Sequence, residues 1–329
     1  MTQAAQLAQY GSNNVGLSFK NRIINGDMTI DQRNNGAAVT VNSSGSNFFF
    51  VDRWFGNGQN SDGVFTAQRV STAPVGFNNS LQFTVTTADS SIGATQGYTF
   101  RQRVEGFNFA DMMWGTASAQ TVTLSFWVRS SLTGNFGGSI FNENGDRIYV
   151  FPYTINSANT FEYKTITILG DTTGTWVGAT NGVALNLTFS LGVGSTFKGT
   201  AGAWSSTFAF APTGSVDLIS TNGATLFITG VQIEKGTVAT SFDYLPYTTE
   251  LLLCQRYYQK QSVATYGCSD GSNTIFNGTY VTKRASPTNT FTTNFSIGGG
   301  GADVDGYGIY SFGVANNRNV TAVFSSAEL

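Results

Sequence analysis

Histidine is absent from this chain of 329 residues, and charged residues make up only 11% of it. Without histidine, the side chain most often used for general acid–base work, Ser-His-Asp and Cys-His nucleophilic sites and most zinc sites are excluded. The net charge is −2, and the sequence has no basic stripe of the kind that neutralises nucleic-acid phosphates. We therefore expect neither nucleic-acid binding nor the common forms of enzymatic catalysis.

Long apolar runs are also lacking, and none approaches the ~20 residues of a membrane-spanning helix. The first residues, Met-Thr-Gln-Ala-Ala-Gln, have neither the basic start nor the apolar stretch of a secretion signal. We expect a soluble, non-exported chain without membrane insertion. The two cysteines, Cys254 and Cys268, could pair, but one falls in a predicted helix and the other in a turn-rich stretch. Two reduced thiols are the favoured interpretation.

Carboxylates are the remaining groups that could cleave a glycosidic bond or bind a metal ion. Two pairs are close in sequence: Glu105 with Asp111, and Glu143 with Asp146. Both pairs lie in turns, without the apolar surroundings that raise the pKa of a general acid. The run Asp303-Val304-Asp305-Gly306 resembles the first half of an EF-hand loop, but no bidentate glutamate follows it, so a tight turn is favoured. We expect no enzymatic activity, no metal and no cofactor.

Aromatic residues and period-two alternation are what the chain has in abundance. Its 27 Phe, 13 Tyr and 5 Trp provide the apolar area of a sizeable core. Apolar residues alternate with polar or small ones in the segments 81–85, 98–104, 122–128, 166–168 and 183–191. Separated by Gly-, Asn- and Thr-rich turns, such segments are typical of antiparallel strands with one buried face. The sequence predicts an all-β fold, with a jelly-roll sandwich over residues 21–247.

A module boundary falls within residues 229–260, where the strand pattern gives way to an apolar segment after Pro246. We expect a helix over residues 249–260, capped by Thr248, in a hinge of residues 248–260. Residues 261–329 would then form a small C-terminal β-rich tip domain, and residues 1–20 an N-terminal docking segment.

The predicted helix is apolar on more than one face, at Leu251, Leu252, Leu253, Tyr257 and Tyr258. Such a helix favours a short three-chain bundle, and the alternative is a helix wedged between two domains of one chain. A tip of ~70 residues buries little of its surface and usually needs oligomerisation or staples. Both observations favour a homotrimer.

Several motifs resemble, in collinear order, a family of bacteriophage structural proteins commonly described as tail fibre or adsorption proteins. The motifs are NRIINGDM (21–28), DQR (31–33), VDRW (51–54), SFWVRSSLTG (125–134), DTTGTW (171–176), LGVGSTF (191–197), GAW (202–204), LCQRYY (253–258), YVTKRASP (280–287) and SAEL (326–329). The resemblance covers roughly residues 20 to 329. It implies a carbohydrate-binding-module-like jelly roll followed by the LCQRYY hinge. Such jelly rolls often bind a structural calcium, which here would bring Asp27 near Glu234.

The resemblance also implies a function. We expect a homotrimeric virion protein on a phage tail or capsid, joined to other virion proteins through its N-terminus and attaching to a host cell-surface glycan. One alternative is a capsid-surface fibre or decoration protein without a receptor. A second, from a different class, is a surface-polysaccharide depolymerase with a carboxylate dyad.

Aromatic side chains that could stack on sugar rings are the candidate binding residues. Trp176 and Trp204 follow small-residue turns, although both fall in family motifs, which favours a packing role. The tip gathers aromatic and amide groups suited to polar glycans at Tyr266, Tyr307, Tyr310, Asn316, Asn317 and Arg318. A solvated loop is the alternative interpretation of the tip residues.

Overall fold

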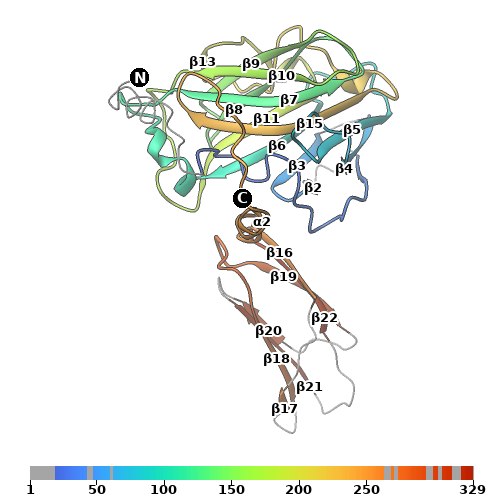
Figure 1. Ribbon diagram of the computed structural model, residues 1–329, viewed down its shortest axis with the longest axis vertical. Helices are drawn as coiled ribbons and strands as arrows, with labels where there is room; N and C mark the ends of the chain where they lie inside the picture. The colour runs from blue at the N-terminus through green and yellow to red at the C-terminus, as the bar shows by residue number, and fades with distance from the viewer. Residues whose placement is uncertain are drawn as a thin grey trace, which may run out of the picture.

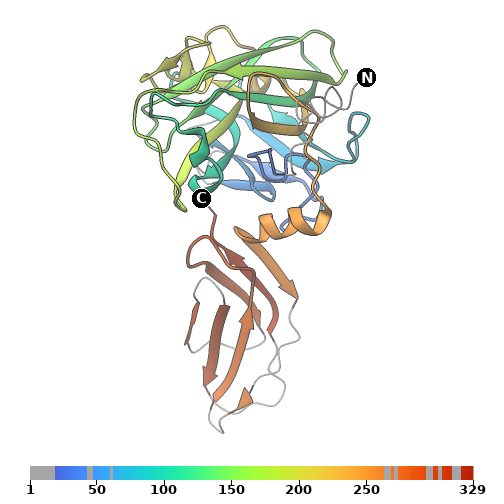
Figure 2. The same ribbon diagram turned by 60° about the vertical axis from the view of Figure 1, so that its left-hand side comes forward.

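The computed structural model describes residues 19–42, 47–59, 62–262, 268–269, 273–293, 299–302, 306–312 and 320–328. A broad body of two stacked sheets lies at one end, and a narrow β-rich unit extends away from it, with a short helix between them (Figures 1 and 2). The all-β jelly roll, helix and small tip predicted from the sequence are therefore confirmed as the order of the fold.

The body is built from two antiparallel sheets. Sheet A has the order β1-β4-β5-β15-β7-β10, with strands Val39–Val41, Val64–Val70, Ser80–Thr87, Thr225–Lys235, Val122–Ser130 and Glu162–Ile168. Sheet B has the order β13-β9-β8-β11-β6-β3-β2, with strands Trp204–Ser205, Ile148–Ile155, Gly134–Phe141, Val183–Val193, Gly97–Glu105, Trp54–Gln59 and Phe48–Val51. Besides consecutive pairs such as β4–β5 and β8–β9, both sheets contain neighbours from distant parts of the chain, such as β5 with β15 and β6 with β11, as jelly-roll connections require.

The core lies between the inner faces of the two sheets. The apolar residues of the five predicted alternating segments fall on β5, β6, β7, β10 and β11, and most are fully buried. Phe83 of sheet A stacks on Phe100 of sheet B with ring centroids 4.3 Å apart, and Phe100 stacks on Phe189 at 5.0 Å. Phe126 closes this cluster edge-on to Phe189 at 5.2 Å.

A short segment covers part of the outer face of sheet B. It contains a parallel pair of two-residue strands, β12 (Lys198–Gly199) and β14 (Ala211–Pro212), and packs a second apolar cluster against β8, β9 and β11. Phe210 and Ala211 of this segment pack with Phe141, Ile148 and Val150 of the sheet. Much of this outer face is therefore withdrawn from solvent.

The helix α2 runs from Tyr247 to Gln255, and β16 (Tyr258–Ser262) follows it almost at once. The predicted helix over residues 249–260 is thus too long, because Tyr258 pairs with Ser326 in a tip sheet. Thr248 is not the cap: Pro246 precedes the first helical residue and gives no side-chain cap. In the part of the chain described here, no helix is long and apolar enough to cross a bilayer.

The tip consists of two small antiparallel sheets. One has the order β16-β22-β19, with β22 at Val320–Ser326 and β19 at Thr288–Thr293. The other has the order β17-β18-β21-β20, with strands Cys268–Ser269, Asn273–Thr279, Gly306–Phe312 and Gly299–Ala302. Cys254 lies on α2 as a buried free thiol, away from the strand that holds Cys268.

Charged side chains tie the body, helix and tip together. Glu105 of β6 is buried, and its carboxylate accepts hydrogen bonds from Arg256 at 2.6 and 3.0 Å and from the Tyr257 hydroxyl at 2.6 Å. The carboxylate of Glu328, beyond β22, pairs with Arg53 and with Arg33, the latter at 2.8 Å. This set of contacts is called the junction below.

Asp52, beside the junction, is a fully buried carboxyl group. Its Oδ2 accepts from the backbone N–H of Gln32 at 2.8 Å, while its Oδ1 has no hydrogen-bond partner in the part of the chain that the structure describes. Burial raises the pKa of Asp52 to about 7, against hydrogen bonds from Gln32 and the charge of Arg33 that lower it. The protonated carboxyl is therefore the form that the fold prefers.

We expect Asp52 to make the body less stable as pH rises. A raised pKa means that the folded state binds the proton more tightly than the unfolded state. The contribution of protonated Asp52 to the free energy of unfolding is fully present below about pH 4 and is lost as the pH rises to 7. Each unit by which burial raises the pKa of Asp52 changes the free energy of unfolding by about 1.4 kcal/mol. Thermal unfolding followed from pH 5 to 8 should show a falling midpoint, and the fall should be smaller in Asp52→Asn. Part of the fall stays in both proteins, because burial also raises the pKa of Glu250 to about 7.

The matched control is Glu162→Gln. Glu162 lies at the surface, where hydrogen bonds from Lys164 and residues 156–157 outweigh desolvation and lower its pKa to about 2. Its titration lies below the pH range measured, so this variant should keep the wild-type slope. An unchanged slope in Asp52→Asn would show that the Asp52 carboxyl titrates in its ordinary range.

Candidate functional site

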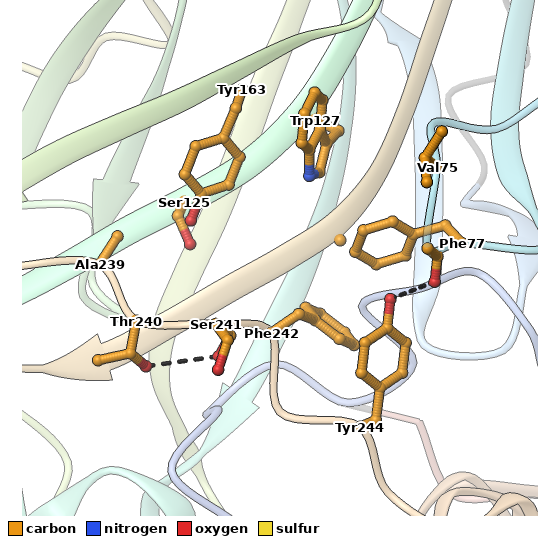
Figure 3. A pocket seen from close by; sticks show the side chains of 12 residues that line it. Val75, Phe77, Ser125, Trp127, Tyr163, Ala239, Thr240, Ser241, Phe242 and Tyr244 are labelled. Carbon is orange, nitrogen blue, oxygen red and sulfur yellow. Dashed lines mark hydrogen bonds between the residues drawn. The ribbon is translucent and has the colours of Figure 1, made fainter. Parts of the chain in front are cut away.

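A groove opens on the outer face of sheet A, over strands β7, β15 and β10 (Figure 3). It has a volume of about 390 Å³. Two segments stand over the strands and form its walls, the β4–β5 loop at residues 75–77 and the chain after β15 at residues 239–244. We call it the aromatic groove. Its lining residues are Val75, Gly76, Phe77, Ser125, Trp127, Tyr163, Gly230, Ala239, Thr240, Ser241, Phe242 and Tyr244.

The floor of the groove follows from strand alternation. Leu124, Phe126 and Val128 of β7 point into the core, so the residues between them point outward. Trp127 is one of these and pairs across the ladder with Tyr163 of β10. Their rings lie 5.3 Å apart, tilted by 44°, and Tyr163 is 42% exposed. These two rings give the floor an apolar surface that solvent reaches.

Gly230 lets one wall approach the floor. It lies in an irregularity of β15 with a φ of +62°, a conformation that strongly favours glycine. A Cβ at this position would lie 2.6 Å from Cζ of Phe77 and 3.2 Å from Cδ1 of Trp127. The absence of a side chain therefore allows Phe77 to lie directly over the strand, next to Trp127.

The two wall segments meet in a cluster of three aromatic rings. Phe77 contacts Phe242 at 5.2 Å and Tyr244 at 5.5 Å, and these two contact each other at 4.8 Å. The Tyr244 hydroxyl donates to the Gly76 carbonyl at 2.5 Å and so joins the two wall segments (Figure 3). Burial, followed by the nearby charge of Asp27, raises the pKa of Tyr244, which keeps the hydroxyl protonated as that donor.

The rim of the groove is polar but uncharged. Thr240 is held by Glu234, which accepts from its backbone N–H at 2.8 Å and from its hydroxyl at 2.7 Å. Lys20 donates to Thr240 and, at 2.7 Å, to the Ser241 carbonyl. These charged groups support the rim without being part of the lining. Lys20 also ties the end of the predicted docking segment to the body, while residues 1–18 lie outside the described residues.

The arrangement has the chemistry of a site for a neutral, partly apolar ligand. Ligand pockets combine aromatic walls with a few hydroxyl and backbone groups that fix orientation. Here aromatic rings line the floor and one wall, Ser125, Thr240 and Ser241 contribute hydroxyls, and no lining residue is charged. Nothing in the lining can supply a nucleophile activated by a base or a pair of carboxylates. The lining therefore offers aromatic rings and hydroxyls as contact groups for such a ligand.

Trp176 and Trp204, predicted as candidates for stacking, form a cluster with Trp114. The three rings lie 4.8 to 5.5 Å apart and nearly perpendicular. The Trp176 indole donates to Asp171 at 3.1 Å, and the Trp204 indole donates to the Leu169 carbonyl at 2.8 Å. Their contacts are those of loop-anchoring residues, the interpretation that the sequence favoured.

The tip candidates are only partly described. Tyr307 and Tyr310 lie on β21, where they pair with Gly278 and Ile275 of β18. Tyr266, Asn316, Asn317 and Arg318 lie outside the described residues, as do Asp303 and Asp305 of the predicted turn.

The five residues of the predicted helix that were proposed for trimerisation have different environments, and two of them lie beyond the end of α2. Tyr257 is buried against Glu105 with its ring under Arg53 at 3.5 Å, and Tyr258 is buried under Arg33 at 3.4 Å. Both tyrosines are therefore covered by their own chain. Leu251 and Leu253 pack, half-buried, on a cluster with Ile24 and Ile30, and Leu252 is 52% exposed.

The carboxylates considered from the sequence have separate roles. Glu105 holds the junction, whereas Asp111 pairs with Arg22 at 2.8 Å on the surface. Asp146 accepts from the Asn142 side chain at 2.6 Å in the β8–β9 turn, next to Glu143. Asp27 accepts from the Thr29 hydroxyl at 2.7 Å, and Glu234 holds Thr240. Among the described residues, no cluster of three metal-ligating side chains occurs.

None of the residues that line the aromatic groove was among the candidates predicted from the sequence. A signal was present in the run SFWVRS, where Phe126 belongs to the core and Trp127 must face outward. A second signal was the pair Phe242 and Tyr244, shortly before the predicted hinge of residues 248–260. What brings these residues together is the pairing of β7 with both β10 and β15.

Neither a protein-family model nor a curated protein matches this chain. Among solved structures, the enzymatically active domain of tailspike protein 4 from bacteriophage CBA120 is 14% identical over 66% of this chain and 22% of its own, with a TM-score of 0.35. A family 11 carbohydrate-binding module from Clostridium thermocellum, in complex with a mixed-linked tetrasaccharide, is 12% identical over 62% of this chain and 98% of its own, with a TM-score of 0.28. The jelly-roll assignment rests on the strand order given above.

We expect Gly230→Ala to disturb the groove as well as the backbone. The substitution adds a Cβ to a left-handed residue, at a cost of roughly 1–2 kcal/mol, and also forces Phe77 away from Trp127. Urea denaturation and near-ultraviolet circular dichroism measure the two effects. Gly223→Ala is the matched control, because Gly223 has a φ of +75° and nothing within 4 Å of its Cβ position. An equal loss of stability with unchanged aromatic dichroism in both variants would contradict the role assigned to Gly230.

Proposed function

We propose that this chain is a bacteriophage virion protein that binds a glycan of the host cell surface through the aromatic groove of its jelly roll. The observation that supports the proposal most directly is an open groove with Trp127 and Tyr163 on its floor, hydroxyls on its rim and no charged lining residue. Sugar rings have apolar faces that pack on aromatic rings and hydroxyls that bond to polar groups at the edge.

The virion assignment is supported by the sequence resemblance, which extends over nearly the whole chain. The observed all-β architecture, a jelly roll followed by a short helix and a small β-rich tip, supports the same assignment. We propose that residues 1–20 join the protein to other virion components and that the tip adds further contacts with the host. The protein acts by binding, and attachment to the tail or to the capsid is equally consistent with this role.

Homotrimerisation is part of the proposal. A single aromatic groove makes a few stacking and hydrogen-bonding contacts, and three copies would raise the apparent affinity by about 10² to 10⁴ through avidity. Exposed Leu252 and Tyr247 of α2 offer apolar surface for contacts between chains.

Light scattering on the purified chain is expected to give about three times its mass of 35.1 kDa. The reason is the apolar surface of α2 together with the small size of the tip. Leu252→Asp with Tyr247→Ser should shift the mass toward the monomer. A wild-type protein that remains monomeric at micromolar concentration would contradict the trimer.

Glycan binding is tested with host surface polysaccharide fragments and the full-length protein in calorimetry. Trp127→Ala and Tyr163→Ala should each weaken binding about tenfold, the effect of losing ~1.4 kcal/mol of stacking. Binding should depend little on salt, because no charged side chain lines the groove. The control is Phe107→Ala, which removes a 59% exposed aromatic ring outside the groove and away from α2 and should leave affinity unchanged.

The same assay distinguishes the other assignments. Binding that survives the groove variants but is lost in Tyr307→Ala or Tyr310→Ala would place the receptor site in the tip. Release of reducing ends from the polysaccharide would identify a depolymerase. Absence of binding, with labelling of virion heads in negative-stain images, would identify a capsid decoration protein.

A further inference from the structure

A row of side chains crosses the outer face of sheet B. Arg101 of β6 faces Phe55 of β3 on one side and Thr188 of β11 on the other, and Thr188 faces Ser139 of β8. The adjacent row, which contains Phe189, belongs to the core between the sheets. Because side chains alternate along a strand, the row with Arg101 points away from that core.

Three polar atoms of this row are buried and have no hydrogen-bond partner among the described residues: Nε of Arg101, Oγ1 of Thr188 and Oγ of Ser139. Thr188 and Ser139 are each 0% exposed. A buried polar atom without a partner costs about 1–3 kcal/mol, so three in one row indicate a missing partner. The two hydroxyls bond neither each other nor the guanidinium. Because the three residues are direct neighbours across β6, β11 and β8, one bridging group is the simplest partner for all three atoms.

The positive charge of Arg101 is not compensated. Its Nη2 donates to the Thr99 hydroxyl at 3.0 Å, and no Asp or Glu of the described residues forms an ion pair with it. Its guanidinium carbon lies 5.9 Å from the Phe55 ring and 5.1 Å from the Phe210 ring. Burial, together with the neighbouring charge of Arg103, lowers the pKa of Arg101 to about 10. A cation between two aromatic rings without a carboxylate favours an anion from solution.

We propose that Arg101, Thr188 and Ser139 bind one small monovalent anion of the size of chloride. All three groups can donate a hydrogen bond, and an anion both accepts from all of them and balances the charge of Arg101, which a water molecule does not. The ligand must be small, because Phe210 and its cluster cover this face and both hydroxyls are fully buried. The anion would supply the counter-charge of Arg101 and satisfy the three atoms at once.

The site would couple anion binding to the stability of the body. An anion that binds only the folded state stabilises it in proportion to the logarithm of its concentration. Bound here, it would bridge β6, β11 and β8 beneath the segment that carries β12 and β14. This role concerns the fold of the jelly roll and is independent of the aromatic groove on sheet A.

The test compares thermal unfolding in sodium chloride and in sodium gluconate at equal ionic strength. For wild type, the midpoint should be about 2–4 °C higher in chloride. Thr188→Val keeps the shape of the side chain but removes its hydroxyl, and Arg101→Met removes the charge; both should lose most of this difference. Arg129→Met is the matched control. Arg129 also has a buried Nε without a partner among the described residues, and it lies 5.0 and 5.9 Å from the rings of Phe227 and Phe161. It is on the outer face of sheet A, however, and its neighbour on β15 is Phe227 instead of a residue with a hydroxyl.

A crystal of wild-type protein soaked in bromide supplies an independent readout that needs no variant. The proposal expects an anomalous peak within hydrogen-bond distance of Arg101 Nε and the two hydroxyls. No bromide peak there, or a chloride effect of equal size in wild type and Thr188→Val, would overturn it. A missing bromide peak would assign a water molecule to these three groups. An equal chloride effect would assign the stabilisation to general effects of salt.

Discussion

The stack of Phe83, Phe100 and Phe189 joins the two sheets of the body, with ring centroids 4.3 and 5.0 Å apart. It fixes which face of each strand points inward, and strand alternation then fixes every outward residue as well. A slip of one residue in β6 would exchange Phe100 for Arg101 and place a charge in the core. The outer row with Arg101 and the groove floor with Trp127 both depend on the same inner register.

Much of this register could be predicted from the sequence. Strict alternation from Val183 to Leu191 identified β11, and the shorter alternations identified four more strands of the body. The packing role favoured for Trp176 and Trp204 agrees with their contacts, although their partner Trp114 gave no signal, since it lies in a turn far away in sequence. Alternation states which residues face outward, but it does not state what covers them.

For that reason, the sequence alone did not predict the aromatic groove. It needs the left-handed backbone of Gly230, the loop with Phe77 and the segment with Tyr244, and these meet only after β15 has paired with β5 and β7. The helix shows the same limit. Its apolar residues fit contact between chains as well as a helix set between two units of one chain, because both arrangements bury more than one face. Sequence pattern gives the number of buried faces without the identity of what buries them.

The two ends of the tip lie side by side at Tyr257 and Ala327. The backbone N–H of Ala327 donates to the Tyr257 carbonyl at 2.6 Å, and Tyr258 pairs with Ser326 on the next rung. The chain therefore leaves the junction and returns to it across a single strand spacing, about 5 Å. In topological terms residues 258–326 are a closed excursion, comparable to a domain inserted into a loop. Recombination could replace this excursion with one of another length or sequence while the body keeps its register, so the two parts can evolve at different rates.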